Sequence, residues 1–143
     1  MVMPVENRPS LLRRLAAVLY DGMLLIALWM GAGMLWIALQ GGEAAGANDG
    51  LFRVYLLAVA YAFFIGFWVK AGRTLGMQAW RLRLVDAEGK PVTVRAATHR
   101  FVTAILSWLP AGAGFLWAML DREGLTWHDR LSKTYLYLEP KRR

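Results

Sequence analysis

Three long uncharged stretches divide the chain and predict where it crosses a membrane. Residues 22–42, 54–69 and 101–120 contain no Asp, Glu, Lys or Arg and are 21, 16 and 20 residues long. About 20 apolar residues cross the hydrocarbon core of a bilayer, with about 17 as the lower limit. We therefore expect full transmembrane helices at about 12–39 and 51–69, and a third apolar segment at 101–120.

The third apolar segment contains a break that leaves two arrangements open. Residues 110–114 read Pro-Ala-Gly-Ala-Gly, and a proline inside a helix removes a hydrogen bond and clashes with the preceding turn. The segment either crosses as a third span or folds back as a re-entrant helical hairpin. Folding back would place 16 of the 17 Lys and Arg residues on the cytoplasmic side, whereas a full crossing would place the six from Arg122 to Arg143 outside. The positive-inside rule favours the re-entrant hairpin.

The region between the second and third apolar segments is polar and contains a strand pattern. Residues 80–85 alternate with period two, 86–91 form a turn sequence, and 92–94 are apolar at every second position. We expect a small β-hairpin at the cytoplasmic surface, because the unpaired edges of a sheet cannot lie in lipid. Upstream of it, Thr74 is placed to cap a short helix. The predicted fold class is thus an all-α integral membrane protein with a small cytoplasmic β-hairpin excursion.

The N-terminus predicts the orientation of the chain. Ser10 is a candidate N-cap, and Arg8, Arg13 and Arg14 precede the first apolar run. That run is longer than the roughly 7–15 apolar residues of a signal peptide, so we expect an uncleaved anchor with a cytoplasmic N-terminus. We expect one membrane domain at 11–138, with tails at 1–10 and 139–143.

Composition narrows the class of function. The net charge is +7, but only 19% of residues are charged and 57% are hydrophobic. The basic residues flank apolar spans, so they are expected to contact anionic lipid at the cytoplasmic face and not nucleic acid. The chain has no cysteine, which excludes disulfides and thiolate metal sites.

A carboxylate inside the first predicted span is the leading candidate site. Asp21 follows Arg14 by seven residues, so both lie on nearly the same helix face. An ionisable residue at such depth is costly unless it is paired or wetted, and it marks a site by default. Asp21 is either a carboxylate that binds a proton or cation, or one half of a structural ion pair with Arg14 or Arg100.

His128 and Asp129 form a second candidate site near the C-terminus. The imidazole beside a carboxylate fits a proton relay, since histidine titrates near neutral pH. The alternative is a capping and salt-bridge cluster that anchors the C-terminal segment to Arg100, Arg73 or Arg14. The sequence contains no metal-ligand spacing and no nucleophile motif, so we expect no enzyme, no metal and no cofactor.

Several motifs, taken in chain order, resemble the RDD family of small bacterial membrane proteins. The resemblance covers residues 11–138 and includes the name-giving residues Arg14, Asp21 and Asp129, together with Arg100 at the start of the third apolar run. It departs from the family at Met77, where Lys is frequent, and at Lys133, where Gly is usual. The motifs are Arg14-Leu-Ala-x-x-x-x-Asp21, the turn Gly72-Arg-Thr74-Leu-Gly76, Arg83-Leu-Val-Asp-Ala-Glu-Gly89 and Leu125-Thr-Trp-His-Asp129-Arg-Leu-Ser-Lys-Thr134.

The resemblance implies a multi-pass protein of the bacterial plasma (cell inner) membrane, with ion or small-solute transport such as cation/proton exchange. Two full spans cannot enclose a pathway, so transport implies a homo-oligomer. The competing hypothesis is a non-catalytic scaffold or an accessory subunit that binds a partner membrane protein. In both, Asp21 is expected to be the deepest member of a cytoplasm-facing cluster with Arg14, Arg100, His128 and Asp129.

Overall fold

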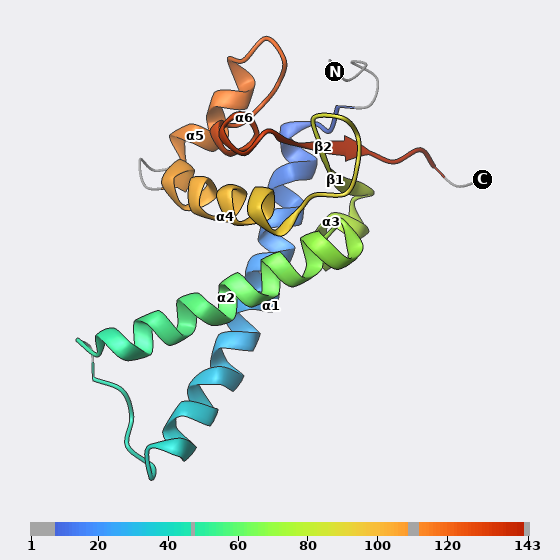
Figure 1. Cartoon of the computed structure of the whole chain (residues 1–143). Coiled ribbons are helices and arrows are strands. Elements are labelled where there is room, and N and C mark those ends of the chain that lie inside the picture. The colour runs from blue at the N-terminus through green and yellow to red at the C-terminus, as the bar shows by residue number, and fades with distance from the viewer. Residues whose placement is uncertain (1–7, 47, 109–111, 142–143) are drawn as a thin grey trace.

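Two long helices, α1 and α2, form the elongated part of the molecule (Figure 1). The computed structural model describes residues 8–46, 48–108 and 112–141. Helix α1 spans Leu11–Leu39 and helix α2 spans Gly50–Ala71, as the uncharged stretches predict. Each begins at a side-chain cap, because Ser10 accepts from the backbone N–H of Arg13 and Asp49 accepts from that of Phe52.

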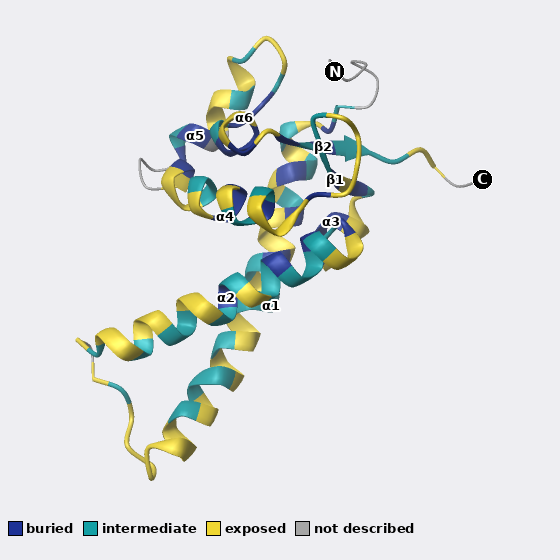
Figure 2. Cartoon of the chain, in the orientation of Figure 1, coloured by how far each residue is buried: buried dark blue, intermediate teal, exposed yellow. Residues whose placement is uncertain are grey.

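Both helices are long and apolar enough to cross a membrane. Apolar side chains of α1 are turned outward, with Leu19 68%, Met30 67% and Met34 72% exposed. Figure 2 shows the distal halves of α1 and α2 mostly exposed, whereas buried residues gather where the other elements pack. An apolar surface of this extent requires lipid or a partner to cover it.

A two-stranded antiparallel sheet lies beside the cytoplasmic ends predicted for these helices. After α2 the chain forms the short helix α3 (Leu75–Ala79), capped by Thr74 as predicted, and then strand β1 (Leu82–Asp86). Strand β1 pairs with β2 (Thr134–Leu138), with Leu84 opposite Leu136.

The predicted β-hairpin within 80–94 is therefore wrong, although its first strand is correct. Residues after the Asp86 turn do not return as a strand, because helix α4 begins at Val94. Asp86 closes the turn by accepting hydrogen bonds from the backbone N–H groups of Glu88 and Lys90. The fully buried Leu82 and Leu84 find their apolar partner face in the C-terminal strand.

The third apolar segment does not form one continuous helix in the described residues. Helix α4 runs from Val94 to Trp108, and its 15 residues reach only about 22 Å, less than the hydrocarbon core of about 30 Å. Helix α5 (Ala113–Leu116) and the 3₁₀ turn η2 (Trp117–Met119) follow. The break predicted at 110–114 falls partly on residues 109–111, which lie outside the described residues.

Helix α5 packs back against α4. A Cβ atom placed at Gly114 would lie 2.8 Å from Cα of Ser107, so the two helices approach closely at a residue that must be glycine. Helix α6 (Trp127–Ser132) then lies along α4, and β2 completes the sheet (Figure 1). Helices α5 and α6 thus both lie against α4 in the described residues.

Candidate functional site

Asp129 lies at the centre of a buried ion cluster that joins three segments of the chain. Arg14 of α1 donates from Nη1 to Oδ2 of Asp129 at 2.5 Å, and Arg100 of α4 donates from Nη1 to Oδ1 at 2.6 Å. Arg100 Nη1 also donates to Thr134 Oγ1 at 3.1 Å. We call Arg14, Arg100 and Asp129 the Asp129 cluster; their side chains are at most 3% exposed.

The local fold of α6 holds the Asp129 carboxylate in place. Thr126 is the N-cap of α6, and its hydroxyl accepts from the Asp129 N–H while the carboxylate accepts from the Thr126 N–H. This capping box orients the side chain through contacts that do not involve either arginine. The predicted capping and salt-bridge cluster is therefore present, with Arg14 and Arg100 as its cations.

The charges of the cluster fix the protonation state of Asp129. Burial alone would raise the pKa of this carboxyl, but the charges of Arg100 and Arg14 outweigh burial and hold the pKa well below its usual range. Asp129 is thus ionised at every physiological pH. The two arginines still exceed it by one positive charge.

Asp21 is not the partner of these arginines, contrary to the sequence prediction. Its Oδ2 accepts a short hydrogen bond from Thr74 Oγ1, and its Oδ1 accepts from the Gly76 N–H at 2.8 Å. Among the described residues, Arg14 and Arg100 form their ion pairs with Asp129. Side chains on an α-helix lean towards its N-terminus, so Arg14 extends away from Asp21, which lies two turns further along α1.

The turn at residues 72–76 positions α3 against Asp21 of α1. Gly72 ends α2 in the left-handed region (φ 68°), and Thr74 both caps α3 and binds Asp21. A Cβ at Gly76 would lie 2.8 Å from Cγ of Asp21 and closer still to the carbonyl oxygen of Ala17. Only glycine allows α3 to approach α1 closely enough for the Gly76 N–H to reach the carboxylate.

His128 is buried beside the Asp129 cluster. Its Nδ1 lies 3.2 Å from Ser107 Oγ on α4. Burial first, and the charge of Arg100 second, lower the pKa of His128 to about 3 despite the opposing effect of Asp129. The imidazole is therefore neutral near pH 7, and its charge does not change in the range that a physiological proton relay requires.

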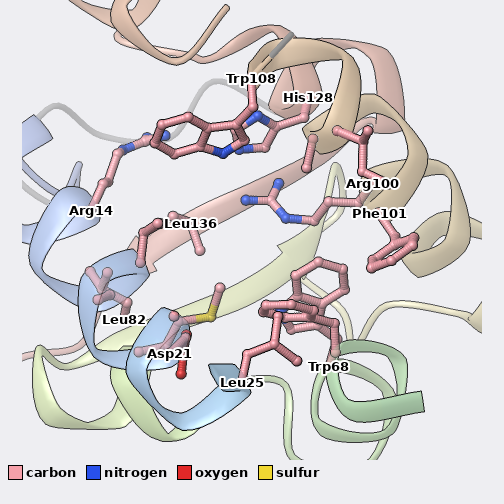
Figure 3. A pocket seen from close by; sticks show the side chains of 17 residues that line it. Arg14, Asp21, Leu25, Trp68, Leu82, Arg100, Phe101, Trp108, His128 and Leu136 are labelled. Carbon is pink, nitrogen blue, oxygen red and sulfur yellow. The ribbon is translucent and has the colours of Figure 1, made fainter. Parts of the chain in front are cut away.

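A cavity of about 580 Å³ lies between α1, α2, α4 and the sheet, with Arg14, Asp21, Arg100 and His128 in its wall (Figure 3). These four side chains are 5% exposed or less. The rest of the lining is apolar, and the exposed members of the lining are Val18, Ile105 and Trp108. The other lining residues are Ala17, Gly22, Leu25, Phe64, Trp68, Met77, Leu82, Phe101, Ala104 and Leu136.

Some residues of the site escape sequence reasoning, and one has a different partner from the predicted one. Arg73, expected near Asp129, instead pairs with Glu139 at 2.7 Å. Trp68 is buried, and the Arg100 guanidinium lies 5.7 Å from its ring centroid. Thr134 ends the Leu125–Thr134 motif, but no local pattern indicates that its hydroxyl reaches Arg100.

The sequence profile of the RDD family matches residues 8–133. The match includes every candidate site residue, from Arg14 to Asp129. No protein of curated function and no solved structure matches the chain significantly.

Proposed function

The chain belongs to the RDD family, and on that premise we propose that it is a multi-pass protein of the bacterial plasma membrane that binds a small solute or ion in its cavity and transports it. The cavity is the observation that supports this proposal. It lies beside two helices of spanning length and combines apolar walls with four buried ionisable side chains. Pockets that hold small molecules have this composition and volumes of roughly 300–1,000 Å³.

The proposed topology has a cytoplasmic N-terminus and two full crossings, α1 and α2. The segment after Arg100 enters from the cytoplasmic side and folds back between α4 and α5. This arrangement gathers the basic residues at the cytoplasmic face, where anionic lipid attracts them. It also puts the Asp129 cluster and the cavity at that face.

Transport by this chain requires a homo-oligomer, since two spans cannot enclose a pathway. Apolar residues exposed on α1 and α2 supply the surface for such contacts or for lipid. We expect no catalytic reaction. Cation/proton exchange at Asp21 would require the carboxylate to exchange its hydrogen bonds from Thr74 and Gly76 for the cation or proton.

The second candidate is a membrane scaffold or accessory subunit of a partner membrane complex. One observation favours it: both oxygens of Asp21 and both of Asp129 already accept hydrogen bonds from within the fold. In that case the charges hold α1, α3, α4 and α6 together and have no other role.

Flux through proteoliposomes separates the two candidates. We expect wild-type protein to show pH- and cation-dependent flux, and Asp21→Asn to fold with a thermal midpoint near wild type but to lose flux. A protein that is monomeric in detergent and shows no flux above that of empty liposomes would exclude transport. Flux that Asp21→Asn leaves unchanged would exclude Asp21 as the carboxylate that binds the cation or proton. Under the scaffold candidate, Asp21→Asn lowers expression and the thermal midpoint.

A further inference from the structure

The exposed residues of the cavity wall are apolar, whereas all its charged residues are buried. Its exposed members, Val18, Ile105 and Trp108, are 38%, 42% and 48% exposed and carry large apolar side chains. Its charged members, Arg14 and Arg100, are 3% and 2% exposed. The exposed part of the wall can therefore contact a hydrocarbon chain, while the guanidinium groups are shielded from solvent.

The two guanidinium groups retain hydrogen-bonding capacity. Within the described residues, the hydrogen bonds of both arginines start at Nη1 alone, although a guanidinium has five N–H groups. Arg14 Nε and Trp68 Nε1 are buried nitrogens with no hydrogen-bond partner in the described part of the chain, and both side chains line the cavity. Buried donors of this kind are costly unless something accepts from them.

The sign of the charge at this end of the cavity selects an anion. Asp129 offsets one of the two arginines, and His128 is neutral, so one positive charge remains. Asp21 lies on the opposite side of the cavity (Figure 3), and its oxygens accept from Thr74 and Gly76. Arginine is the side chain best suited to bind phosphate or carboxylate oxygens in such a site.

We propose that this cavity binds an acidic lipid from the membrane, with one hydrocarbon chain against the apolar wall and the anionic head group at Arg14 and Arg100. The inference rests on the proposed function to the extent that it names the solute of the same cavity. The volume of about 580 Å³ fits a single chain, and the apolar wall includes the exposed Val18 of α1 and Ile105 of α4. The head group accepts hydrogen bonds that the arginines do not make within the protein.

The probe for this proposal is lysophosphatidic acid, added to the full-length protein in a nonionic detergent. Its two controls are the monoacylglycerol of the same chain, which lacks the phosphate, and inorganic phosphate, which lacks the chain. We expect native mass spectrometry to retain one lysophosphatidic acid per chain, and the thermal midpoint to rise with that lipid alone. Equal stabilisation by the monoacylglycerol, or by inorganic phosphate, would overturn the proposal.

Two glycines of α1 provide a matched pair of variants. A Cβ at Gly22 or at Gly31 would meet nothing within 4 Å, but only Gly22 lines the cavity. Gly22→Leu is expected to fill the cavity and to weaken lysophosphatidic acid binding by about tenfold or more, and Gly31→Leu to leave it unchanged. Ala104→Phe fills the same cavity from α4 and makes the test independent of α1. Wild-type affinity in folded Gly22→Leu and Ala104→Phe would refute the site.

The flux experiment keeps this proposal separate from the proposed function. If the protein shows no flux but binds lysophosphatidic acid, and Gly22→Leu abolishes that binding, the lipid site is supported and transport is excluded. If the protein does not bind lysophosphatidic acid but shows flux that Gly22→Leu blocks, transport is supported and the acidic lipid is refuted as its solute.

Discussion

Asp129→Asn is the substitution that tests the ion cluster most directly. Asparagine keeps the shape of the side chain and its capacity to accept from the Thr126 N–H, but it removes the negative charge that pairs with both Arg14 and Arg100. Two buried cations then face each other without an anion. Breaking a buried ion pair by removing one partner costs about 3–5 kcal/mol.

The thermal midpoint of the purified protein in detergent measures this loss. For a chain of this length, each kcal/mol lowers the midpoint by about 3 °C, so we expect a decrease of about 10–15 °C. Glu88→Gln is the matched control, because Glu88 pairs with Lys90 at 2.9 Å but both side chains are 71% exposed. An exposed pair of this kind contributes little to stability, so the control midpoint should stay within about 3 °C of wild type.

Arg14→Met separates the charge argument from a simple loss of contacts. This change removes one cation and leaves Arg100 and Asp129 as a balanced buried pair. It should therefore lower the midpoint less than Asp129→Asn does. If Arg14→Met is the more damaging of the two, or if Asp129→Asn behaves like Glu88→Gln, the electrostatic reasoning is wrong.

Three further predictions follow from contacts and backbone conformation. Gly76→Ala should push α3 away from α1 and lower the thermal midpoint, at a cost of roughly 2–4 kcal/mol from weakened hydrogen bonds to Asp21. Gly66→Ala is the control, because a Cβ there meets nothing within 4 Å, and equal midpoints for the two variants would contradict the close approach of α3 to α1. The pKa of His128 is about 3 in the folded state and near 6.5 in the unfolded state, so the unfolded state binds more protons between these values and stability falls as the pH drops. From pH 7 to pH 5 we expect a loss of about 2 kcal/mol, and His128→Asn should remove most of the pH dependence of the thermal midpoint. Lys133 occupies the left-handed region (φ 52°) after α6, so Lys133→Gly should raise the thermal midpoint by the equivalent of up to about 1 kcal/mol. A lower midpoint would show that the lysine side chain itself stabilises the turn.

Local patterns were sufficient for the elements that local interactions determine. The uncharged length of α1 and α2, the caps at Ser10 and Thr74 and the alternation that marks β1 are all readable within a few residues. The sequence also contained the RDD motifs, and these included the residues that line the cavity with charge.

Pairing between distant segments was decided by the tertiary structure alone. Alternation in 82–86 predicts a strand but not its partner, and the buried leucines of β1 pair with 134–138 and not with the adjacent 92–94. The same limit applies to Asp21 and Asp129. Helical periodicity places Arg14 and Asp21 on one face of α1, yet Arg14 leans away from Asp21, and each binds a different segment.

Gly76 and the capping box of α6 determine which segment binds each carboxylate. Gly76 lets α3 approach Asp21, so this carboxylate accepts hydrogen bonds from the Thr74 hydroxyl and the Gly76 N–H. Thr126 orients Asp129 towards α1 and α4, so the arginines bind there. Hydropathy and charge along the chain were enough to identify the long helices α1 and α2 and the candidate charged residues. The partners were fixed by packing, because a buried charge pairs with whatever the fold brings within hydrogen-bonding distance.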